Sequence, residues 1–135
     1  MPFSSTWRPR VECQIIGIPR TIRLELWWTE FCIGTISEMP GGDVYAAIDR
    51  YSQAGRLAYV HLRNVQGKAP NYHEMFVDDG DTDMLRVLRI LHKNGFDGVL
   101  IPDHTPLLEC EAPWHAGMAF ALGWMRAAMT LIERE

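Results

Sequence analysis

A thiol, an imidazole and a carboxylate each stand at the end of a short apolar stretch of this chain. Cys32 follows Phe31, His61 ends the run 57–61, and Asp103 comes directly after Pro102. Each stretch has the length and composition of a buried strand, and ligands of α/β proteins bind at the carboxyl ends of such strands. A thiolate, an imidazole and a carboxylate together can hold a divalent ion such as Mn²⁺ or Fe²⁺. The three groups therefore predict a metal site.

Each of the three residues also has an interpretation without a metal. Cys32 can be a small buried apolar side chain, His61 a hydrogen-bonded core histidine, and Asp103 the cap of the next turn beside a solvated His104. A carboxylate directly after a buried strand must nevertheless find a cation or hydrogen-bond donors. The occurrence of three such groups at the ends of successive strands favours the metal site.

Strands and helices that alternate along the chain are expected to position these groups. The strands are expected at residues 31–36, 57–62 and 99–101. The helices are expected between Asp43 and Gly55, between Asp81 and Gly95, and over residues 115–135. The two aspartates are the predicted N-caps, and the core face of the second helix is formed by Leu85, Leu88 and Leu91. A polar loop is expected at 64–72. This order predicts an α/β fold with a parallel sheet, either a small open sheet or part of a barrel.

Composition excludes several classes of protein. The chain has 135 residues, 47% of them hydrophobic and 22% charged, which is typical of one globular domain. A net charge of −4 argues against a nucleic-acid partner, and no apolar stretch approaches the roughly 20 residues of a membrane span. The first five residues lack the features of a secretory signal. Cys13, Cys32 and Cys110 lie far apart, a pattern that predicts reduced cysteines and a cytoplasmic location.

Six motifs along the chain resemble, in the same order, those of the mannonate dehydratase family. They are FCIG at 31–34, YVHLRNV at 59–65, FVDDGDTDM at 76–84, GFDGV at 95–99, PDHT at 102–105 and APWHAGMA at 112–119, within a region from about Ile15 to Arg126. The resemblance implies a (β/α)₈ TIM barrel of the xylose-isomerase-like kind. It also implies a lyase that removes water from D-mannonate to give 2-dehydro-3-deoxy-D-gluconate in hexuronate (glucuronate) catabolism.

The resemblance assigns roles to particular residues of this chain. Cys32, His61 and Asp103 match three of the four metal ligands of the family, whose ion is Mn²⁺ or Fe²⁺. His104 matches a residue placed for proton transfer. At or near the position of His115, some members of the family have a tyrosine to which an acid/base role is given. Arg63 and Asn64 fall where substrate oxygens would lie.

The chain also departs from the family pattern. The fourth ligand of the family lies in a His-Pro-Asp-Asp-Pro-Pro motif that has no counterpart here. We therefore expect an irregular or altered N-terminal segment at residues 1–29, followed at 30–135 by about three C-terminal β-α units of a TIM barrel. The strand near Phe31 is expected to be an open edge, so that the chain pairs with a second copy or with a missing barrel half.

Three functions remain open at the level of sequence. The first is a mannonate dehydratase-type enzyme in which His104 and His115 move protons while the metal stabilises an enediolate. The second is another metal-dependent sugar enzyme of the same barrel class, such as an isomerase. The third is a non-catalytic truncated barrel or an assembly module.

Overall fold

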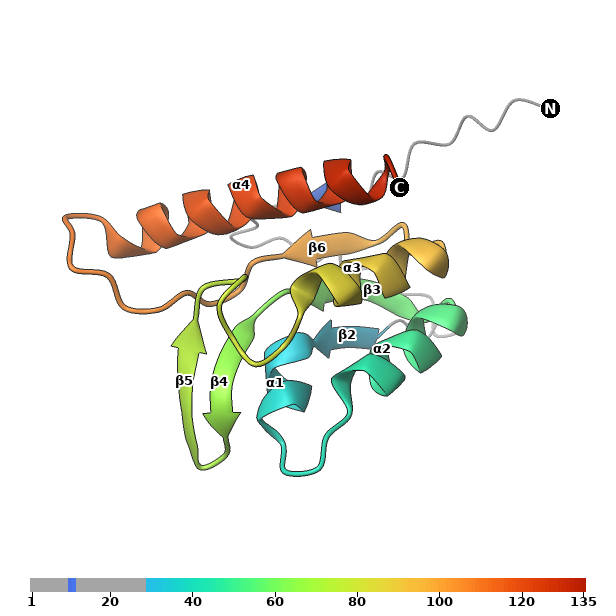
Figure 1. Cartoon of the computed structure of the whole chain (residues 1–135), viewed down its shortest axis with the longest axis horizontal. Coiled ribbons are helices and arrows are strands. Elements are labelled where there is room, and N and C mark those ends of the chain that lie inside the picture. Colours follow the sequence, from blue (N-terminus) through green and yellow to red (C-terminus); the bar gives the residue numbers. More distant parts are fainter. Residues whose placement is uncertain (1–9, 12–28) are drawn as a thin grey trace, which may run out of the picture.

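The computed structural model describes residues 10–11 and 29–135, with side chains described from residue 29 onward. In chain order, the elements of this part are β1 (Arg10–Val11), β2 (Thr29–Cys32), α1 (Ile33–Glu38), α2 (Val44–Gln53), β3 (Leu57–His61), β4 (Asn64–Lys68), β5 (Asn71–Met75), α3 (Met84–Lys93), β6 (Val99–Ile101) and α4 (Pro113–Ile132). Figure 1 shows the strands β2, β3 and β6 side by side, with the β4–β5 hairpin beyond one end of them.

A four-stranded parallel sheet forms the centre of the fold. Its strand order is β1-β6-β3-β2, so β1 and β2 are its two edges. The register aligns Cys32 with His61 and His61 with Ile101, which brings the carboxyl ends of three strands to one level. The expected parallel α/β sheet and the open edge at β2 are therefore confirmed among the described residues.

The helices form a layer against one face of this sheet. α2 packs against α3, and α3 packs against α4 (Figure 1). The buried side chains of α3 recur at helical spacing and join the same apolar cluster as Phe31, Val60 and Leu100 of the strands. Because side chains alternate across a strand, these three residues mark the face of the sheet that the helices cover.

Between residues 31 and 84, two element boundaries differ from the sequence prediction. The strand predicted over residues 31–36 ends at Cys32, where the chain turns into α1 and buries Ile33 and Ser37 on one helical face. The β-propensity of this stretch thus yields to packing. Asp43 caps α2 as predicted, accepting from the backbone N–H groups of Tyr45 and Ala46. Asp81 was wrongly predicted as a cap, since Asp83 caps α3.

Asp81 and the segment 64–72 both differ from their predicted roles, and the two contact each other. The segment was predicted as a polar loop, but it forms most of an antiparallel hairpin, β4–β5. Gly67, with φ of +93°, allows the close approach of the backbone at Asn71. The Asp81 carboxylate accepts a hydrogen bond from the Gly67 N–H at 2.9 Å, so it holds the hairpin instead of a helix.

The last helix begins at Pro113, two residues before the predicted start, and ends at Ile132. Proline is favoured in the first helical turn because it lacks the N–H that would be unpaired there. No helix of residues 29–135 combines the length and apolarity needed to cross a bilayer. The irregular segment predicted at 1–29 lies outside the described residues, apart from the short strand β1 and Thr29, and its boundary remains a prediction.

Candidate metal centre

Three strands bring Cys32, His61 and Asp103 to one place. Cys32 ends β2, His61 ends β3, and Asp103 follows β6 after Pro102. Each residue offers one ligand atom, and the three atoms all lie within 4.8 Å of one another. All three side chains are partly buried. The structure thus brings together the three residues that the sequence singled out, while their role as metal ligands remains a prediction.

Negative groups surround the imidazole of His61. Its Nδ1 lies 3.4 Å from Asp103 Oδ2 and 3.4 Å from Glu30 Oε1. The hydrogen bonds that the His61 imidazolium donates to Asp103 and Cys32 raise the pKa of His61 to about 10. Burial raises the pKa of Asp103, but the His61 hydrogen bond and charge outweigh burial and leave that pKa below its usual value. The cluster is therefore balanced only when a positive charge lies among these groups.

The sequence prediction missed Glu30, although the sequence contained the signal. Glu30 stands two residues before Cys32 in β2, and alternation places both side chains on one face of the sheet. Its carboxylate also accepts a hydrogen bond from the Tyr59 hydroxyl at 2.7 Å. That bond raises the pKa of Tyr59 to about 12. Glu30 thus links the edge strand to the polar face of β3.

The thiol of Cys32 is set up to ionise. Burial alone raises its pKa, but hydrogen bonds from His61, Thr35 and Arg63 together lower it below the usual value. The thiolate is the form of cysteine that binds metals. The surroundings of Cys32 thus differ from those of an ordinary buried cysteine.

The backbone at Asp103 is strained. Its φ is +64°, the only positive φ of a non-glycine residue in the described part of the chain. Aspartate tolerates this region better than most residues, yet such conformations still cost on the order of 1 kcal/mol and cluster at functional sites. Here the turn aims the carboxylate back at His61, which an extended continuation of β6 would not do.

Arg63 lies at the same end of the sheet and is 8% exposed. Its guanidinium pairs with Glu74 Oε1 at 2.6 Å and with Glu38 Oε2 at 3.0 Å, and these contacts raise its pKa. A Cβ on Gly34 would lie 2.8 Å from Arg63 Cγ, so glycine there leaves room for the side chain. The predicted contact of Arg63 with substrate is not tested by these contacts.

Asn64 is 1% exposed, and its side chain is engaged on both sides. Its amide nitrogen donates to the carbonyls of Val77 and Thr82 at 3.0 and 2.9 Å. Its amide oxygen accepts from the N–H of Thr82 at 3.2 Å. These bonds fasten the start of β4 to the segment before α3. Contact with substrate remains a prediction for Asn64.

The two histidines predicted to move protons lie in different settings. His104 is beside the centre, with Nε2 at 3.7 Å from Asp103 Oδ1 and Nδ1 at 3.5 Å from Glu74 Oε1. Glu74, from β5, was another residue that sequence reasoning missed, because it lies in the segment 64–76 that carried no strand prediction. His115 is exposed in the first turn of α4. Two residues further along α4, a Cβ on Gly117 would lie 2.3 Å from Thr105 Oγ1, so the helix packs closely on the segment that follows Asp103.

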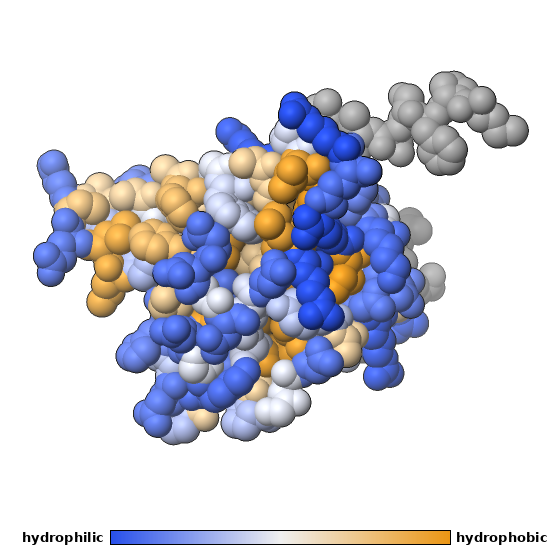
Figure 2. Space-filling view, in the orientation of Figure 1, coloured by the Kyte–Doolittle hydropathy of each residue, from blue (hydrophilic) through white to orange (hydrophobic). Residues whose placement is uncertain are grey.

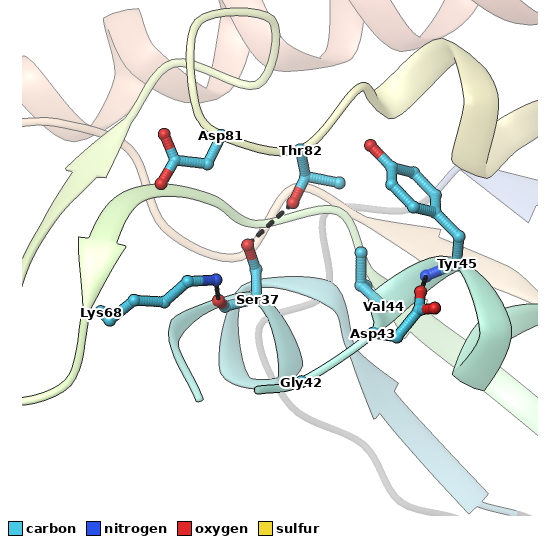
Figure 3. A pocket seen from close by; sticks show the side chains of 8 residues that line it. All are labelled: Ser37, Gly42, Asp43, Val44, Tyr45, Lys68, Asp81 and Thr82. Carbon is cyan, nitrogen blue, oxygen red and sulfur yellow. Dashed lines mark hydrogen bonds between the residues drawn. The ribbon is translucent and has the colours of Figure 1, made fainter. Parts of the chain in front are cut away.

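A pocket of about 220 Å³ lies between α1, β4 and the start of α2, and none of the three candidate ligands lines it. Figure 3 shows Ser37 and Thr82 joined across it, their hydroxyl oxygens 2.8 Å apart. Lys68 donates from its ammonium group to the backbone carbonyl of Ser37. These contacts tie the hairpin to α1 and so support the position of Arg63 at the head of the hairpin.

Known proteins resemble the chain both in sequence and in fold. Residues 19–130 match the family profile described as D-mannonate dehydratase (UxuA). A mannonate dehydratase of Lactococcus lactis subsp. cremoris (strain MG1363) is 29% identical over 112 residues, covering 70% of this chain and 31% of that protein. One from Thermotoga petrophila is 29% identical over 83 residues, covering 58% of this chain and 22% of that protein.

A solved structure shares the fold of most of this chain. The crystal structure of mannonate dehydratase from Streptococcus suis serotype 2 superposes with a TM-score of 0.68 at 21% sequence identity. The match covers 76% of this chain and 32% of that one. The chain thus spans about a third of the length of the relatives it matches.

Proposed function

Because the chain belongs to the D-mannonate dehydratase family, we propose that it is the part of a metal-dependent hydro-lyase that carries the metal centre. The reaction is the dehydration of D-mannonate to 2-dehydro-3-deoxy-D-gluconate, a step of hexuronate (glucuronate) catabolism. The proposal is carried by the meeting of Cys32, His61 and Asp103, with ligand atoms within 4.8 Å of one another. The strained turn at Asp103 supports it as well.

The donor set suits Mn²⁺ or Fe²⁺. Cys32, His61 and Asp103 would hold the ion, because a thiolate favoured by its hydrogen bonds, an imidazole and an ionised carboxylate are ligands for such metals. The excess of negative groups around His61 would be balanced by the ion once the imidazole gives up its proton. A bound metal supplies Lewis-acid stabilisation of the negative charge that develops on a sugar acid.

The chain's own residues would then move two protons. In the proposed reaction His104 takes the proton from C2 of D-mannonate, and an acid gives a proton to the departing 3-hydroxyl group, for which His115 is the candidate. Glu74 and Asp103 on either side of His104 orient its ring for this transfer. The packing of Gly117 on Thr105 keeps the turn that bears His115 close to the segment that bears His104.

Arg63 and Asn64 contribute differently to the substrate site. Arg63 carries a fixed positive charge beside Cys32 and suits the carboxylate of a sugar acid. Asn64 uses its amide on Val77 and Thr82, so we propose that it acts on substrate by holding the rim of the site in place. The separated free cysteines of the described part, Cys32 and Cys110, fit our proposal of a reducing, cytoplasmic setting.

Titration with Mn²⁺ tests the metal centre directly. We expect Asp103→Asn to raise the dissociation constant for Mn²⁺ at least about tenfold, because loss of a ligand should cost no less than loss of the residues that support ligands. Asp97→Asn, an exposed change of the same charge near the start of β6, serves as the matched control and should leave the affinity unchanged. Equal Mn²⁺ affinity of Asp103→Asn and the unchanged protein would contradict the assignment.

A product assay separates the proposed function from its alternatives. Purified protein with Mn²⁺ and D-mannonate should form a 2-keto product, and Asp103→Asn should abolish it. Formation of a ketose from an aldose, with no 2-keto acid, would identify a sugar isomerase instead. A second candidate, a non-catalytic truncated barrel or assembly module, is favoured by the missing counterpart, in this sequence, of the motif that holds the fourth ligand of the family. It predicts no turnover of any sugar or sugar acid.

A further inference from the structure

The two faces of the parallel sheet differ in how far they are buried. On one face, side chains from α1, α2, α3 and α4 form a single buried cluster with Phe31, Val60 and Leu100. On the other face lie the side chains that alternate with these, and each is exposed or only partly buried: Glu30, Cys32, Tyr59, His61, Val99 and Ile101. Parallel sheets are almost always covered on both faces. Within residues 29–135, the helices cover only one.

The two edges of the sheet are open as well. Among the described strands, β1 pairs only with β6 and β2 pairs only with β3. An unpaired edge strand offers its backbone groups to another strand. Because all four strands run in one direction, β2 of one copy could continue the sheet of another copy beyond β1 without reversing any strand.

We propose that two copies of this chain join edge to edge into a closed parallel barrel, with β2 of each copy beside β1 of the other. A two-fold axis parallel to the strands keeps every strand in the same direction, and both new edge pairings are then identical. Two sheets of four strands give the eight that close a parallel β/α barrel filled by side chains. The face that the helices leave uncovered becomes the barrel interior, and the helix layer stays outside.

The stretch of chain between the two edge strands β1 and β2 is short. Residues 12–28 connect β1 to β2 and lie outside the described part. A crossover between parallel strands takes a dozen or more residues by itself. This segment is therefore too short to place four further strands between β1 and β2, whereas a second copy brings four strands of matching direction.

The pairing also completes the metal centre, and here the inference rests on the proposed function. Cys32 and Glu30 lie on the edge strand β2, so in a single copy the centre borders the open edge of the sheet. In the closed barrel the partner's β1 lies against that edge, and the two centres face a common mouth at the carboxyl ends of the strands. The substrate would then be enclosed by both copies.

A different surface of the chain could also pair, and it provides the control. Figure 2 shows hydrophobic side chains gathered along α4. On the outer side of that helix, Phe120 is 44% exposed and Leu131 is 49% exposed. A dimer held through α4 would bury these residues, whereas a closed barrel leaves them outside.

Sedimentation velocity on the full chain tests the inference. The unchanged protein should sediment as a dimer, that is, as a species with twice the chain mass of 15.5 kDa. Val99→Asp places a charge on the uncovered face, away from the metal centre, and should shift the protein to the monomer. Leu131→Asp places the same charge on the outside of α4 and should leave the dimer intact. Far-UV circular dichroism of both variants checks that they fold.

Each outcome decides between the surfaces. A monomeric unchanged protein at all concentrations overturns the barrel, and this result needs no variant. A dimer broken by Leu131→Asp and not by Val99→Asp overturns it in favour of pairing through α4. The proposed function fails separately: a dimer that sediments as expected but binds no Mn²⁺ keeps the barrel and rejects the metal centre.

Discussion

The two faces of the sheet formed by β2, β3 and β6 are built from neighbouring residues of the same strands, yet one is buried under helices and the other carries polar groups. Val60 and Leu100 are fully buried beneath the helices, while His61 and Val99, one residue away, are only partly buried. The covered face is purely apolar, and the opposite face carries Glu30, Tyr59 and His61 joined by hydrogen bonds or ion pairs. Alternation along a strand is enough to separate the two.

The difference shows where this chain obtains its stability and where it keeps its chemistry. A packed apolar face contributes free energy of folding in proportion to the area that it removes from water. Charged groups such as Asp103 and Glu30 are costly to bury without partners, so they remain where solvent, an ion or another chain can reach them. The same strands can therefore anchor the fold on one side and present a reactive cluster on the other.

The largest expected effect comes from the covered face. Leu100→Ala should lower the free energy of unfolding by about 2–5 kcal/mol, because it opens a cavity among fully buried side chains. Val99→Ala, the neighbouring residue on the uncovered face, should cost about 1 kcal/mol or less in a separate copy, since fewer of its contacts are lost there. Urea unfolding at a protein concentration at which the copies are separate measures both. Equal losses would mean that the two faces are packed alike, against the comparison above.

A smaller effect is expected where polar groups are buried at the site end of the sheet. Asn64→Ala removes the partners of the Val77 carbonyl and of both backbone groups of Thr82, and each unpaired buried group costs roughly 1–3 kcal/mol. We therefore expect a loss of at least about 2 kcal/mol in the free energy of unfolding. Asn64→Asp keeps the acceptor but places a carboxylate oxygen against the carbonyls of Val77 and Thr82, so its loss should be at least as large. Lower Mn²⁺ affinity without any loss of stability would instead indicate a direct role at the centre.

The smallest effect is expected on the outer surface of the helix layer. Hydrogen bonds from Asn94 and Gln53 and the charge of Lys93 hold the pKa of Asp49 below its usual value. A carboxyl group with a depressed folded-state pKa adds stability above its unfolded pKa of about 3.9 and loses it as the pH falls through the folded value. At pH 7, Asp49→Asn should therefore be slightly less stable than the unchanged protein.

The change of this stability difference with pH shows whether the ionised carboxylate of Asp49 stabilises the fold. The difference between Asp49→Asn and the unchanged protein should shrink as the pH falls below about 4, because the carboxyl of Asp49 is then protonated first in the unfolded chain and, at lower pH, in the folded protein. Asp97→Asn controls for the change in net charge. Thermal midpoints measured from pH 7 down to pH 3 check this expectation. A difference that grows toward acid pH would show that Asp49 does not stabilise the packing of α2 on α3.

Sequence reasoning succeeded where a local pattern and the final fold require the same thing. The apolar runs before His61 and Asp103 are strands, and Asp43 caps its helix, because burial and capping depend on residues close in sequence. It failed where distant residues decide. The strand predicted at 31–36 becomes a helix after Cys32 because Ile33 packs in the common core. Asp81 binds the Gly67 N–H across the hairpin, a partner that no local pattern reveals.

The sequence by itself determined which chemical groups stand at the ends of β2, β3 and β6, because the alternation of apolar and polar residues sets the ends and the faces of strands. Only the tertiary structure decided that these groups meet, that Glu30 joins them, and that Glu74 lies against the neighbouring His104. Strand order and register fix those distances, and both depend on how helices far apart in the chain pack together. The positive φ of Asp103 belongs to the same category, since a strained turn persists only when the structure around it holds it in place.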